Sequence, residues 1–196
     1  IWIQPALTDW FVHPSNTTIA VAIVKTGLRD DFDHLVLPYS QCITEERLRE
    51  NEVGLGDEVF ITGLFRHHHG TRKNIPIVRV GNLACMTEEK ISTNLFGEMD
   101  AYLIEARSIG GLSGSPVFLN LGITRMIKNT VQFARGNPIF YLLGLVHGHY
   151  DVKSTEVDGT EEDNENELSP ERVNTGIAIV VPFHNIDAVI TAFETR

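Results

Sequence analysis

The chain has 196 residues, of which 42% are hydrophobic and 21% are charged, a composition that is ordinary for a globular protein and excludes global disorder. Most of the formal net charge of −10 comes from residues 151–171, which hold nine acids and one lysine. The rest of the chain has no basic excess, and no apolar run approaches the roughly 18 residues that a membrane helix needs. We therefore expect neither nucleic acid nor a membrane among the partners.

The two cysteines, Cys42 and Cys85, form neither a metal-ligand spacing nor a dense disulfide framework. This usage favours a reducing cytoplasm over secretion, although the sequence also allows one disulfide between the two cysteines. The chain begins at Ile1 without a methionine or a signal-like segment. We therefore expect it to be a fragment or a processed chain.

Short apolar and β-branched runs, most of them bounded by Gly, Pro, Asn or Asp, predict a mainly β protein. In chain order these runs are 18–25, 34–38, 58–65, 75–84, 101–107, 115–121, 140–147 and 176–182. Two stretches indicate helices: residues 44–51, which begin with a capping pattern, and the apolar-striped segment from Phe183 onward. The pattern predicts an all-β barrel or sandwich closed by a C-terminal helix.

The acidic segment 151–171 separates two predicted strands and lacks the apolar content to pack. We expect a mobile loop. It is either a solvated surface loop or an insertion that excludes substrates or binds a partner.

The stretch from Gly111 to Phe118 reads Gly-Leu-Ser-Gly-Ser-Pro-Val-Phe, a glycine-rich turn that leads into an apolar strand. Glycines beside Ser113 permit unusual backbone angles, so its hydroxyl can project while nearby N–H groups converge on one point. Such N–H groups are able to hold an oxyanion. The alternative is a plain turn between two strands.

This stretch resembles the nucleophile motif of bacterial trypsin-like serine peptidases, and three further segments fit the same family in the same order: 55–63, 144–148 and 176–182. The resemblance covers roughly residues 15–195. It implies two β-barrels with the active site between them: residues 1–90 for a partial N-terminal barrel and the connection, and residues 91–196 for the C-terminal barrel with its helix.

The resemblance implies that Ser113 is the nucleophile of an endopeptidase acting on polypeptides without a cofactor, and that the N–H groups of Gly111 and Ser113 form the oxyanion hole. Leu112 stands where the zymogen-activated members carry an aspartate. Activation by the Ile1 ammonium is therefore not expected.

Two departures from the family bear on activity. Ala20 occupies the position of the triad aspartate, and one sequence does not distinguish a natural alanine from an engineered one. The triad histidine would lie before Ile1, since His13 is too close to Ala20 in sequence to replace it. A serine without its base is a poor nucleophile, so we expect the chain to be nearly inactive alone.

The N-terminal part also offers few strands. Residues 1–63 supply only about four strand candidates, against about six for a closed barrel, so we expect upstream residues or a second chain to complete the first barrel. A competing hypothesis is a pseudoprotease, a peptide-binding or scaffold module that keeps the cleft without the triad. Ala20 favours that reading, and the intact serine motif favours the enzyme.

Five residues are candidates for substrate binding. The resemblance places Arg107 at the floor of the specificity pocket, with Gly176 and Ala178 leaving room beside it, and this would select an acidic side chain. His147 and His149 would lie on the neighbouring wall and share a face if their strand is regular. Alternatively, Arg107 points to solvent and the histidines make structural hydrogen bonds.

The run of His67, His68 and His69 raises the question of a metal site. Neighbouring strand residues point to opposite faces, so at most two of these side chains converge, and no further ligand follows at a suitable spacing. The sequence favours a polar hairpin tip, and we expect no metal.

Overall fold

The structure is a computed structural model that describes residues 5–31, 33–64, 70, 73–86, 89–93, 97–106, 112–134, 136–153 and 172–196. The side chains of residues 151–153 and 172–174 are not described.

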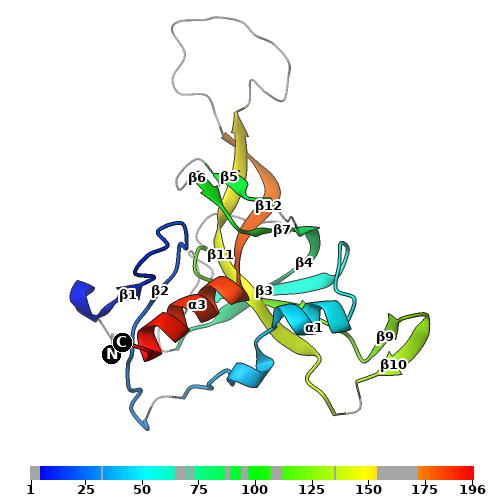
Figure 1. Ribbon diagram of the computed structural model, residues 1–196, viewed down its shortest axis with the longest axis horizontal. Coiled ribbons are helices and arrows are strands. Elements are labelled where there is room, and N and C mark those ends of the chain that lie inside the picture. Colours follow the sequence, from blue (N-terminus) through cyan, green and yellow to red (C-terminus); the bar gives the residue numbers. More distant parts are fainter. Residues whose placement is uncertain are drawn as a thin grey trace, which may run out of the picture.

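Six antiparallel strands form a closed barrel (Figure 1). Their order around the barrel is β11 (Phe140–Lys153), β12 (Arg172–Pro182), β7 (Tyr102–Glu105), β4 (Pro76–Met86), β3 (Glu58–Leu64) and β8 (Pro116–Asn120), which pairs back onto β11. The all-β class is confirmed, as are the six predicted strands that begin at residues 58, 75, 101, 115, 140 and 176. Because β3 and β4 pair with β8 and β7, the barrel draws its strands from both sides of residue 90.

The barrel closes around apolar side chains that alternate along each strand, as expected when one face of a strand is buried. In β3 and β8 the buried positions are every second residue, with polar or larger partly exposed side chains between them. The fully buried set includes Val59, Ile61, Leu83, Ile104, Val117, Leu119, Leu143 and Val180. This continuous core fixes the register of the strands that carry the site.

Both predicted helices are present. In α1 (Glu45–Glu50) the Thr44 side chain caps the helix by accepting a hydrogen bond from the Arg47 N–H at 3.3 Å. The C-terminal α3 (Phe183–Glu194) buries Phe183, Ile186 and Val189 and contacts β11 and β12. None of the described helices is both long enough and apolar enough to cross a membrane.

The part of the chain before β3 is sparse in regular structure. It holds two short 3-10 turns, η1 (Leu7–Asp9) and η2 (Tyr39–Gln41), and a two-stranded ribbon of β1 (Phe11–Val12) and β2 (Ala22–Ile23). The Phe11 ring packs edge-on against Phe193 of α3, with 5.4 Å between ring centroids. The ribbon is therefore anchored beside α3, as Figure 1 shows. A second closed barrel is not formed by the described residues and stays a prediction.

Two further hairpins lie outside the barrel. β5 (Ile91–Thr93) pairs with β6 (Gly97–Met99), and β9 (Thr124–Ile127) pairs with β10 (Thr130–Phe133). The turn of the second hairpin places Lys128 and Asn129 at φ 48° and 60°, the pair of positive angles that a two-residue hairpin loop requires. Cys42 and Cys85 are both free thiols, so the disulfide that the sequence allowed is not formed.

Candidate functional site

Ser113 lies on an exposed turn that is held against β11. The Gly114 N–H donates to the Val146 carbonyl at 2.7 Å, and the Val146 N–H donates to the Ser115 carbonyl at 2.9 Å. Gly114 has a φ of +82°, which a residue with a side chain rarely adopts. The turn therefore presents the Ser113 hydroxyl outward from a fixed backbone.

The turn also sits directly on β3. A Cβ atom at Gly63 would lie 2.5 Å from Ser115 Oγ and 2.9 Å from Leu112 Cδ2. Leu112 itself is buried, at 5% exposure, and anchors the start of the turn in the core. The close approach at Gly63 thus sets how deep the Ser113 turn sits in the barrel wall.

Ser113 opens onto a cleft of ≈ 630 Å³ between the ribbon segment and β11. Most of the lining is apolar, and a few polar side chains are among the lining residues. The lining residues are Val12, His13, Asn16, Thr17, Ile19, Ala20, Val21, Ala22, Ser113, Gly114, Leu145, Val146, His147 and Val181. Ala20 and Ser113, 93 positions apart in sequence, thus share one cavity.

Beside Ser113, one edge of β11 lacks a strand neighbour. β8 pairs with β11 only as far as Leu145, whereas β12 pairs with it up to Lys153. Past the serine turn, β11 therefore has β12 as its single partner among the described strands. An edge of this kind is able to accept an extended peptide through main-chain hydrogen bonds.

His147 lines the cleft, and His149 is not among the described lining residues. β11 is not a regular strand at this point, because its register against β12 shifts between Val146 and Gly148. This bulge makes His147 the extra residue and breaks the alternation that would have placed both histidines on one face. Burial lowers the pKa of His147 below its ordinary value, which favours the neutral ring in the cleft.

The two small residues proposed for the pocket wall lie differently. Gly176 is half-buried, with φ +79°, and its carbonyl accepts a hydrogen bond from the Ala106 N–H at 2.9 Å. Ala178 is fully buried, at 0% exposure, and pairs with Ile104 on the neighbouring strand β7. Ala178 therefore has no surface open to a ligand in this structure.

Several candidates lie outside the described residues: Arg107, Gly111, the run from His67 to His69 and the central part of the acidic segment. Within the part of the chain that is described, no group of three His, Cys, Asp or Glu side chains is placed to hold a metal ion.

His13 and Asn16 join the site, although the sequence reasoning set His13 aside and did not consider Asn16. They lie on the turn between β1 and β2, which faces β11 across the cleft. The available sequence signal was a histidine in a turn-forming His-Pro-Ser-Asn run just before a β-branched segment. Its distance from Ser113 in sequence gave no hint that the two residues line one cleft.

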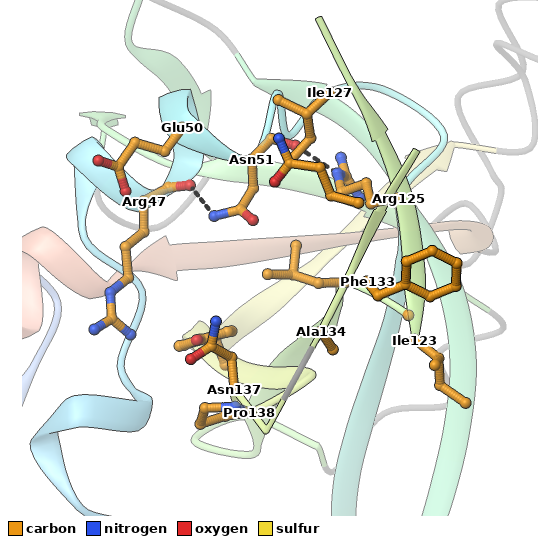
Figure 2. A pocket seen from close by; sticks show the side chains of 14 residues that line it. Arg47, Glu50, Asn51, Ile123, Arg125, Ile127, Phe133, Ala134, Asn137 and Pro138 are labelled. Atoms are coloured by element: carbon orange, nitrogen blue, oxygen red, sulfur yellow. Dashed lines mark hydrogen bonds between the residues drawn. The ribbon is translucent and has the colours of Figure 1, made fainter. Parts of the chain in front are cut away.

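A second cavity, of ≈ 450 Å³, lies between α1 and the β9–β10 hairpin (Figure 2). Arg125 at its back is engaged by both carboxylate oxygens of Asp57, at 2.9 and 2.6 Å. Arg47 donates to the Ser40 carbonyl at 2.8 Å and stacks over Tyr141. No Ser, Thr, Cys or His is among the described residues that line this cavity.

Comparisons of the chain with protein-family models, with curated proteins and with solved structures found no match.

Proposed function

We propose that this chain carries the substrate cleft of a trypsin-like serine endopeptidase, in which Ser113 forms an acyl-enzyme. The observation that supports this most is the exposed Ser113 turn, fixed on β11 next to a strand edge without a neighbour. A peptide extended along that edge would bring one carbonyl carbon to Ser113. The two-barrel fold belongs to the same proposal; because β3 and β4 are part of the barrel described above, the first barrel would draw its strands from the chain before β3.

In the proposed reaction, Ser113 Oγ attacks the peptide carbonyl carbon, and the carbonyl electron pair moves onto its oxygen. The Ser113 N–H, with that of Gly111, would hold this oxyanion. No hydrogen bond involving the Ser113 N–H is present among the described residues, so this donor is available. The serine proton needs a base, and the leaving amine later needs that proton back. We propose that this base lies outside the described chain.

The pseudoprotease remains the second candidate, and one observation favours it. Ala20, which the resemblance places at the triad aspartate, lines the same cleft as Ser113 and has no ionisable group. A cleft of this kind would bind an extended peptide without cutting it.

The test is covalent labelling of the chain with a fluorophosphonate, read by intact mass. We expect slow, incomplete labelling at Ser113, since an oxyanion hole alone gives about 10³-fold over water, some thousandfold below a full triad. Ser113→Ala should abolish the label, and Ser115→Ala, outside the cleft lining, should keep it. In a chain that also carries a histidine base, Ala20→Asp should make the labelling of Ser113 faster.

Labelling that survives in Ser113→Ala would contradict the assignment of the nucleophile. Fast stoichiometric labelling of the unchanged chain would show that its catalytic groups are already complete without Asp at position 20. Peptide binding with no labelling would select the pseudoprotease.

A further inference from the structure

His13 shares the cleft with Ser113, and a histidine beside a serine suggests a general base. Its hydrogen bonds indicate another role. His13 Nδ1 accepts from the backbone N–H of Asn16 at 2.9 Å and of Ser15 at 3.3 Å. An imidazole nitrogen that accepts hydrogen bonds holds a lone pair, so in the neutral ring the proton lies on Nε2. A base at Nε2 would need the opposite tautomer.

Asn16, on the same turn, is arranged in the same way. Its Oδ1 accepts from the Thr18 N–H at 3.1 Å and from the Thr18 hydroxyl at 2.7 Å. The acceptor atoms of both side chains are thus used inside the turn. What remains for a ligand in each case is an N–H donor: Nε2–H of His13 and the Nδ2 amide of Asn16.

The two residues that carry these donors line a cleft that is otherwise mostly apolar. A peptide strand lying on β11 would pair one edge with that strand and turn the carbonyl oxygens of its other edge toward the ribbon segment. Carbonyls buried in an apolar cleft without a donor would be destabilising. The β1–β2 turn is the element that offers donors on that side.

We propose that His13 and Asn16 bind the main-chain carbonyls of the peptide in the Ser113 cleft as fixed hydrogen-bond donors, and that His13 is not the catalytic base. This inference rests on the proposed function, because it requires an extended peptide in the cleft. It makes recognition on this side dependent on the peptide backbone and largely independent of side-chain identity.

Two substitutions test the roles of the two ring nitrogens of His13 separately. His13→Asn keeps an acceptor near the Nδ1 position and removes the Nε2 donor, and His13→Gln keeps a donor near Nε2 and removes the Nδ1 acceptor. The probe is an acetylated, amidated hexapeptide with a central glutamate, titrated into the full chain. We expect His13→Asn to weaken binding about three- to tenfold, as one lost hydrogen bond implies. His13→Gln should bind nearly as the unchanged chain does, with a lower melting temperature.

The tautomer is read independently of any ligand, from the long-range ¹H–¹⁵N spectrum of the imidazole ring. We expect the Nε2–H form in the free chain. An Nδ1–H ring would overturn the inference, as would unchanged peptide affinity in His13→Asn. Absence of peptide binding by the unchanged chain, with the Nε2–H ring intact, would instead overturn the proposed function and the ligand assigned here with it.

Discussion

Gly63 leaves the space into which the Ser113 turn packs against β3. Its missing side chain leaves the space that Ser115 Oγ and Leu112 Cδ2 occupy, at 2.5 and 2.9 Å from a built Cβ. The backbone there is an ordinary strand, so the constraint is space and not an unusual φ.

Gly63→Ala should therefore force the turn outward. We expect the free energy of unfolding to fall by about 1–3 kcal/mol, the usual cost of overpacking a core. The matched control is Gly54→Ala, where nothing lies within 4 Å of a built Cβ. Urea unfolding of both variants measures the difference, and equal stabilities would show that the turn is not held by this contact.

Single residues also mark the limit of sequence reasoning about the site. Ser113 was found because its glycines and proline form a recognisable motif. His13 was set aside because it lies seven positions before Ala20, yet the distance that matters is to Ser113, one hundred positions away. The packing of Phe11 on Phe193 holds the β1–β2 turn over β11, and no local pattern predicts that contact.

At the scale of elements, the six barrel strands were predicted, whereas among the peripheral strands only β2, which lies within the predicted run 18–25, was. β3 and β8 alternate buried and exposed residues, which gives a clear period of two. All four residues of β10 are exposed, so burial gives it no period, although the Lys-Asn turn between two β-branched runs was a usable signal. The run 34–38 has strand propensity but forms no strand, with Leu35 at 101% exposure. A strand requires a ladder partner, which propensity does not supply.

The β9–β10 hairpin is tied to the rest of the chain through Arg125. A two-stranded hairpin alone is marginally stable in water. Arg125 ties β9 to the α1–β3 connection through both Asp57 oxygens and through the carbonyls of Asn51 and Glu52. Both side chains of the pair are mostly buried, at 17% and 20% exposure.

Arg125→Lys should thus destabilise the chain by about 1–3 kcal/mol, because lysine keeps the charge and loses the planar fork. Arg29→Lys is the control, since its pair with Asp31 is exposed at 66% and 56% and should contribute nearly nothing. Thermal unfolding compares the two variants. A loss in Arg29→Lys as large as that in Arg125→Lys would contradict this account of the hairpin.

At the scale of the whole molecule, the two cavities described above are two candidate binding sites. The Ser113 cleft lies between β11 and the β1–β2 ribbon. The second cavity lies beside α1 and the β9–β10 hairpin (Figure 2). The ribbon and the hairpin lie on different sides of the barrel (Figure 1). Of these two cavities, the Ser113 cleft combines a serine hydroxyl, a stretch of β11 beyond its pairing with β8, and the N–H donors of His13 and Asn16. We therefore place peptide binding in the Ser113 cleft.

The most direct test of that claim is to map the central-glutamate hexapeptide onto the ¹⁵N-labelled chain by amide chemical-shift changes. The account predicts that the largest changes fall on residues 113–115 and 146–150, with residues 13–18 following, while residues 47–51 and 132–134 stay unchanged. Changes confined to the cavity beside α1, with Ser113 and β11 unaffected, would contradict it.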